Sequence, residues 1–112
     1  METFEEHYAA MERAINKHIP GADWALINKA VDYASAKHQA QKRKDGSPYI
    51  IHPLAVAEIV ADLGLDVDSV IAALLHDCIE DTPTSHQDIA KKFGEPVAAL
   101  VDHLLLFLGD IL

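Results

Sequence analysis

Turn-forming residues divide this sequence into six segments with the three- and four-residue apolar spacing of an α-helix. The breaks fall at Pro20-Gly21, Asp45-Gly46, Gly64, Pro83 and Gly94. No segment shows the sustained alternation of apolar and polar residues that is typical of a half-buried strand. The pattern therefore predicts an all-α bundle of about six helices, formed as one domain by residues 1–112.

The predicted helices run over residues 3–17, 23–39, 53–63, 66–82, 85–93 and 96–112, with a loop over 41–51. Asp23 is the expected N-cap of the second helix, and Pro53 suits the first position of the third. After Thr84, Gln87 is the expected partner in a capping box. Pro96 is expected to open the last helix.

Charge is distributed unevenly along the chain. Residues 1–57 carry seven acids and seven bases, whereas residues 58–112 carry eleven acids against Lys91 and Lys92. The formal net charge of −9 argues against nucleic acid as a partner, because neutralising phosphates needs a basic face. Cys78 is the single cysteine, and no apolar run approaches the length of a membrane span. We expect a cytoplasmic domain that needs neither a disulfide nor a membrane.

The stretch HDCIED, residues 76–81, is the first candidate for chemistry. On a helix, His76 lies one turn before Glu80, and Asp77 one turn before Asp81. Acids at a helix C-terminus are electrostatically unfavourable, since the carbonyl end is already partly negative, and a bound cation would offset this. Acids that merely solubilise the helix end, with His76 as a cap, explain the spacing equally well.

His52 extends this group, because it follows an apolar stretch and directly precedes Pro53. Together with His76 and Asp77 it would supply three ligands of the kind that suits Mn, Fe or Zn, with positions left for water. Such a site serves hydrolysis, since a metal acidifies water near neutral pH. Glu80 or Asp81 could then accept the proton or orient the water.

Basic residues gather at Lys42, Arg43 and Lys44, eight to ten residues before His52. A basic cluster beside a metal in an acidic protein indicates a small phosphorylated ligand, and a planar guanidinium can also stack on a nucleobase. Taken alone, the triplet fits an ordinary solvated loop better. Among the remaining histidines, His103 is expected to be partly buried, and the following are expected at the surface: His7, His18, His38 and His86.

Residues 34–102 resemble the hydrolase domain of the RelA/SpoT homologues, enzymes of the HD superfamily that degrade the stringent-response alarmone (p)ppGpp. The matching stretches are QKRKDGSPYIIHPLAVAEIVADLGLD at 41–66, AALLHDCIEDT at 72–82 and DIAKKFGEPVAALVD at 88–102. Their order and spacing both match, which is far more specific than a single His-Asp pair. The resemblance implies removal of the 3′-pyrophosphate from ppGpp or pppGpp to give GDP or GTP.

The resemblance also implies residue roles. His52, His76 and Asp77 match three metal ligands, and the metal of the family is usually manganese. Glu80 and Asp81 match the acidic pair that activates water or stabilises the reaction. Arg43 and Lys44 match basic residues that hold the guanine nucleotide.

The chain departs from the family pattern after Asp102, where His103 and an apolar run replace a Gly-Val-Thr-Lys-like stretch. The fourth metal ligand of the family is an aspartate on a later helix, so the domain is expected to be short at this end, and Asp110 is a weak substitute. The apolar run predicts a homodimer or another partner at Leu104–Leu108. Two alternatives stay open: a non-catalytic domain that binds metal or guanine nucleotide, and a general HD nucleotide phosphohydrolase.

Overall fold

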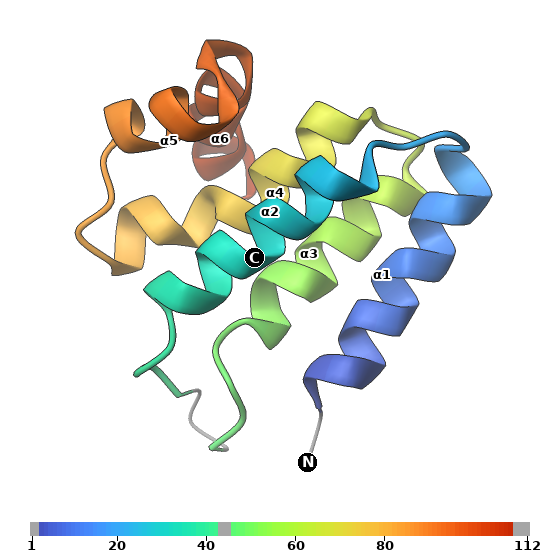
Figure 1. Ribbon diagram of the computed structural model, residues 1–112, viewed down its shortest axis with the longest axis horizontal. Helices are drawn as coiled ribbons and strands as arrows, with labels where there is room; N and C mark the ends of the chain where they lie inside the picture. Colours follow the sequence, from blue (N-terminus) through green and yellow to red (C-terminus); the bar gives the residue numbers. More distant parts are fainter. Residues whose placement is uncertain (1–2, 43–45, 109–112) are drawn as a thin grey trace.

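The computed structural model describes residues 3–42 and 46–108, and the side chains of the last helix as far as Leu104. The described chain is an all-α bundle, as predicted, with six helices (Figure 1). These are α1 (Phe4–His18), α2 (Trp24–Lys37), α3 (Ile51–Asp62), α4 (Val67–Asp81), α5 (His86–Phe93) and α6 (Glu95–Leu108). No described helix is long and apolar enough to cross a bilayer.

Helix α4 is the central element of the bundle. Its nine consecutive residues from Val70 to Cys78 are all buried, because α2, α3 and α6 pack around it. Helix α1 packs on the outer side of α3, and α5 packs on α6. A helix that is covered on every side must be apolar around its circumference, and the stretch VIAALL meets this requirement. The position of α4 places the HDCIED motif at the edge of the core.

Side-chain caps fix where several helices begin. Thr3, Asp23 and Asp66 each accept a hydrogen bond from a backbone N–H in the first turn of α1, α2 and α4, respectively. The first helical N–H groups have no partner within the helix, so an oxygen at this position stabilises the start of the helix. The prediction of Asp23 as an N-cap is confirmed.

Three predicted details at helix starts are wrong. Ser85 caps α5 in a capping box with Asp88, which displaces Thr84 and Gln87 from that role. Pro53 is the third residue of α3 and Pro96 the second residue of α6, so neither proline opens its helix. The first turn tolerates proline at several positions because the N–H groups there have no helical partner in any case.

The connection between α2 and α3 is closed at its base. Lys42 and Pro48 form an isolated antiparallel bridge, and α3 begins at Ile51, inside the predicted loop over 41–51. Gly46 has a φ of 86°, a conformation that an L-residue with a side chain rarely adopts. The bridge brings Gln41 and Tyr49 to the same place beside the end of α4.

Candidate metal centre

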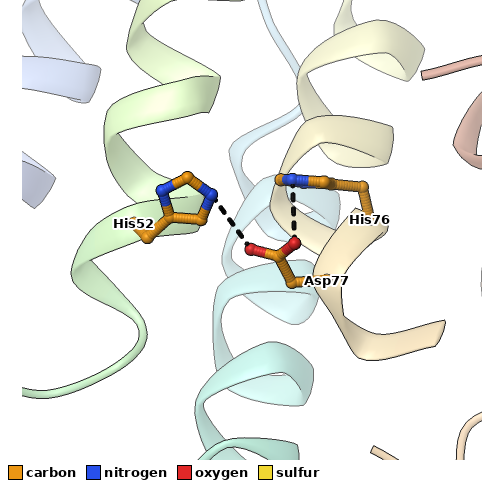
Figure 2. A group of neighbouring side chains, drawn as sticks. All are labelled: His52, His76 and Asp77. Carbon is orange, nitrogen blue, oxygen red and sulfur yellow. Dashed lines mark ion pairs between the residues drawn. The ribbon is translucent and has the colours of Figure 1, made fainter. Parts of the chain in front are cut away.

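Two adjacent helices supply the side chains of the candidate metal centre. His52 lies in the first turn of α3, and His76 and Asp77 lie in the last two turns of α4. Figure 2 shows the Asp77 carboxylate between the two imidazole rings. One ligand atom from each of the three residues lies within 4.8 Å of the others. The structure thus brings together three residues whose role as metal ligands was predicted and stays a prediction.

The two imidazole rings approach different oxygens of the same carboxylate. His76 Nε2 lies 3.1 Å from Asp77 Oδ1, and His52 Nε2 lies 3.2 Å from Asp77 Oδ2. The His76 and Asp77 side chains are 5% and 7% exposed, whereas that of His52 is 31% exposed. The site is therefore closed on the α4 side and reachable by solvent on the α3 side.

A backbone contact determines which nitrogen of the neutral His76 ring carries the proton and which one faces Asp77. Nδ1 lies 2.5 Å from the carbonyl oxygen of Ala73, which only accepts, so Nδ1 carries the proton. In the neutral ring, Nε2 then presents a lone pair to a carboxylate that also only accepts. Either a second proton or a cation must lie between these atoms. Metal-binding histidines are commonly oriented by such a backbone contact.

Asp77 gives the direct test of whether a cation fits. Its Oδ2 atom is buried and, among the described residues, has no hydrogen-bond partner, even though His52 Nε2 is close. A buried carboxylate oxygen without a partner is costly, and ligation of a metal is one of the usual ways to satisfy it. Two nitrogens and a carboxylate form a donor set suited to Mn²⁺, Fe²⁺ or Zn²⁺. These residues fit a divalent transition metal.

The contact between His76 and Asp77 also affects the pKa of both side chains. Burial favours the neutral acid, but contact with His76 and the charges of His76 and His52 lower the pKa of Asp77 below its usual value. Burial likewise opposes the charged ring of His76, yet Asp77 raises its pKa. Asp77 is therefore held as a carboxylate, which is the form that binds a cation.

Glu80 and Asp81 lie beside this group, as the spacing predicted. One oxygen each from Asp77, Glu80 and Asp81 lies within 4.8 Å of the others, and both Glu80 and Asp81 are exposed. The phenol of Tyr49 donates a hydrogen bond to Asp81 Oδ2, and Gln41 Nε2 donates to the Asp81 carbonyl, at 2.8 Å. Two residues from the α2–α3 connection therefore hold the end of α4.

Several predicted residues fall outside the description. Arg43, Lys44 and Asp110 lie outside the described residues, as do the side chains over 105–108. Leu104 is described, and it is half-buried against the core. The nucleotide-binding and dimer predictions therefore stay predictions.

Two histidines were placed wrongly from the sequence. His38 is buried, with 2% exposed, and stacks on Tyr49, while His103 is exposed. The polar neighbours of His38 in the sequence gave no signal, because its partners Tyr49 and Cys78 come from a loop and another helix. Burial, followed by the charge of Asp77, raises the pKa of the Cys78 thiol to about 12. Cys78 is thus a buried, protonated thiol.

The six packed helices and the His76-Asp77 pair on the central helix define a helical domain with a candidate metal site. The HD domain family matches residues 30–106, and the chain belongs to this family. It is 55% identical over 76 residues to the guanosine-3′,5′-bis(diphosphate) 3′-pyrophosphohydrolase of Aquifex aeolicus. It is also 45% identical over 97 residues to the GTP pyrophosphokinase rsh of Brucella melitensis, and 43% over 90 residues to a probable GTP pyrophosphokinase of Mycobacterium leprae.

These matches cover 68%, 87% and 80% of this chain but only 11%, 13% and 11% of the three relatives. The chain therefore spans about a tenth of the length of the proteins it resembles. The names of these relatives confirm the predicted resemblance to the RelA/SpoT homologues.

Proposed function

We propose that this chain is a metal-dependent hydrolase that removes the 3′-pyrophosphate from (p)ppGpp, giving GDP or GTP and pyrophosphate. The observation that carries the proposal is the buried Asp77 carboxylate between His52 and His76 in an HD domain, with an oxygen that has no hydrogen-bond partner among the described residues. The printed activity of the Aquifex aeolicus relative supports the choice of substrate.

In this proposal His52, His76 and Asp77 hold the metal, and the metal is Mn²⁺. When bound, a divalent ion supplies positive charge that acidifies water and polarises phosphoryl oxygens. The Ala73 carbonyl keeps the proton of the neutral His76 ring on Nδ1, so the lone pair of Nε2 is left to bind the metal. Despite its burial, Asp77 stays ionised because its contact with His76 lowers its pKa.

Glu80 and Asp81 are proposed to have different roles toward the attacking water. Glu80 is exposed, at the solvent side of the acidic group, and we assign it to accept the proton that the water loses. Asp81, whose Oδ2 is occupied by the Tyr49 phenol, orients the water. The water oxygen forms a bond to the phosphorus attached to the 3′-oxygen as the bond between that phosphorus and the 3′-oxygen breaks. The 3′-oxygen takes up a proton and leaves as the 3′-hydroxyl of GDP or GTP, and the attacked group is released as pyrophosphate.

Arg43 and Lys44 are proposed to hold the guanine nucleotide. In the sequence they lie between Lys42 and Pro48, the two residues whose bridge closes the base of the α2–α3 connection, and Tyr49 and His52 follow. Their charge matches a phosphorylated ligand, and the net charge of −9 opposes a large polyanion such as nucleic acid. We also propose that residues 1–112 form a single domain of a cytoplasmic protein that does not bind a membrane.

One observation favours a second candidate function, binding without turnover. Among the described residues, the group that joins α3 and α4 supplies three candidate ligands, and the resemblance to the RelA/SpoT homologues implies a fourth. A three-ligand site can hold Mn²⁺ or a guanine nucleotide without completing the reaction. Binding alone therefore does not separate the two functions, and turnover must be measured.

The deciding experiment is pyrophosphate release from ppGpp by the purified chain, with and without Mn²⁺. His76→Ala tests the site, and His103→Ala is its matched control, because His103 is an exposed histidine on α6. We expect Mn²⁺-dependent release in the parent and in His103→Ala, and none in His76→Ala. No release by the parent at saturating Mn²⁺ would leave the binding function as the better explanation.

A further inference from the structure

A series of hydrogen bonds connects Cys78, the buried neighbour of Asp77, with the C-terminal end of α4. His38 Nε2 lies 3.8 Å from the Cys78 sulfur, and His38 Nδ1 lies 3.0 Å from Gln41 Oε1. Gln41 Nε2 in turn donates to the carbonyl oxygen of Asp81, at 2.8 Å. The residues involved are up to 40 positions apart in the sequence, so tertiary structure alone brings them together.

The chemistry of each atom allows one assignment of donors and acceptors. The Asp81 carbonyl only accepts, so the amide nitrogen of Gln41 faces it and the amide oxygen faces His38. His38 Nδ1 therefore donates, and Nε2 is left to accept from the Cys78 thiol. His38 and Cys78 are buried and Gln41 is half-buried, and a rotation of the His38 ring would leave its two nitrogens without these partners.

Tyr49 links this network to the acidic pair. Its ring stacks on His38, with centroids 4.6 Å apart and planes 19° apart, and its hydroxyl donates to Asp81 Oδ2. The ring also lies edge-on to His52, with centroids 6.4 Å apart. Because His38 is buried and fixed, the Tyr49 ring has a firm support on one face.

Asp81 needs such a restraint. It is exposed, and it is the last residue of α4, so its own helix does little to limit the rotation of its carboxylate. A hydrogen bond from a supported phenol to one carboxylate oxygen limits that rotation and fixes where the other oxygen lies. One oxygen of Asp81 thereby stays within 4.8 Å of oxygens from Asp77 and Glu80.

We propose that Tyr49 is the positioning residue for Asp81, and that His38 holds the Tyr49 ring in place. Tyr49 acts through Asp81 and not on the metal, and its contribution is to the rate of the hydrolytic step. This inference rests on the proposed hydrolase function.

The test is Tyr49→Phe, which keeps the ring and its stacking on His38 but deletes the hydroxyl. Tyr8→Phe is the matched control, since it deletes a hydroxyl that donates to Asn28 Oδ1, at 2.6 Å, between α1 and α2. For each variant, kcat and KM for ppGpp are measured, together with Mn²⁺ affinity by calorimetry. In Tyr49→Phe we expect kcat to fall about tenfold, as for the loss of one hydrogen bond to a charged group.

KM and the Mn²⁺ dissociation constant should both stay within about twofold of the parent in Tyr49→Phe, and Tyr8→Phe should match the parent in every value. A merely structural role would weaken metal or substrate binding along with kcat. The pairing is tested by adding Tyr49→Phe to Asp81→Asn, where we expect no further loss of kcat because the residue being positioned is already disabled.

Different results would refute the positioning role of Tyr49 and the proposed hydrolase function. An active parent with unchanged kcat in Tyr49→Phe refutes the positioning role and leaves the hydrolase intact. Equal losses of Mn²⁺ affinity and kcat also refute it, because Tyr49 would then shape the metal site itself. A parent that releases no pyrophosphate overturns the hydrolase, and the positioning role falls with it.

Discussion

Asp77 is the residue on which the candidate site depends most. A buried carboxylate between two imidazoles is stable only while each of its oxygens has a positive or hydrogen-bonding partner, and Oδ2 has no hydrogen-bond partner among the described residues. Glu80 and Asp81, in contrast, are exposed and lie farther along α4. Residues that hold the metal and residues that act on water should therefore respond differently to substitution.

Glu80→Gln is the sharpest single substitution for that difference. It keeps the size of the side chain and removes its ability to accept a proton, so turnover should fall about 100-fold or more. Mn²⁺ affinity should be retained, because Glu80 is not among His52, His76 and Asp77. Calorimetry and pyrophosphate release measure the two quantities separately. A Glu80→Gln variant as active as the parent would remove this residue from the mechanism.

The sequence predicts the part of the candidate site that lies on α4 because its chemistry is local. His76, Asp77, Glu80 and Asp81 share one helix, and helical spacing alone places them near one another. The support of that group is not local, since His38 and Tyr49 reach it from the α2–α3 connection. Nothing in the sequence around His38 distinguishes a buried, stacked ring from a surface histidine.

At the scale of elements, His86 joins α5 to α6. Its Nε2 lies 2.8 Å from Glu95 Oε1 and its Nδ1 lies 2.8 Å from Asp102 Oδ2. Both carboxylates only accept, so both contacts are complete only when the ring is protonated. The hydrogen bond to Glu95 and then the contact with Asp102 raise the pKa of His86 above its ordinary value.

A pH dependence of stability follows from this raised pKa. The stabilising effect of His86 should be fully present below the ordinary histidine pKa, about 6.5, and should disappear as pH rises through the higher value of the folded protein. We expect His86→Gln to be less stable than the parent near pH 5.5 and the difference to shrink near pH 8.5. Urea unfolding at both pH values measures this, with His103→Gln as the control. A difference that grows with pH would contradict the assignment.

The start of α5 gives a second prediction at this scale. Ser85→Ala removes the hydroxyl that caps the Asp88 N–H and should lower the free energy of unfolding by about 1 kcal/mol. Gln87→Ala should change it by less than about 0.5 kcal/mol, because Gln87 takes no part in the capping box. Denaturant titrations of both variants distinguish the observed box from the one that the sequence indicated.

The order and approximate extent of the helices are predictable because glycine, proline and capping residues mark the breaks. The first residue of each helix is less predictable. α3 begins at Ile51 with no side-chain cap, so the only local signal was Pro53, which lies two residues inside. The capping box was predicted between Thr84 and Gln87, whereas the N-cap lies one residue later, at Ser85, and Asp88 is therefore its partner.

For the whole molecule, metal binding should be measurable as stability. The proposed ligands come from α3 and α4 and meet only in the folded chain. At a free Mn²⁺ concentration about 100 times the dissociation constant, the free energy of unfolding should rise by about 2.7 kcal/mol. Thermal unfolding with Mn²⁺ and after its removal by a chelator tests this. His76→Ala should show no such difference, and an equal shift in that variant would place the binding elsewhere.

The assembly of the molecule is a separate prediction. The apolar run over 104–108 favours a homodimer or another partner, and only its first side chain, Leu104, belongs to the described part, where it is half-buried. We expect sedimentation at micromolar concentration to give twice the mass of one chain. A clean monomer would rule out the homodimer.

The nine buried residues of α4 have one more consequence, for how such a chain can change during evolution. Deleting a single residue between Val70 and Leu75 would turn His76 and Asp77 by about 100° around the helix axis. The same deletion would turn the two parts of α4 relative to one another, so their side chains could no longer all keep their contacts with α2, α3 and α6. We therefore expect a one-residue deletion in this segment to disrupt the candidate site, whereas a residue inserted in a connection between helices would leave the geometry of the site intact.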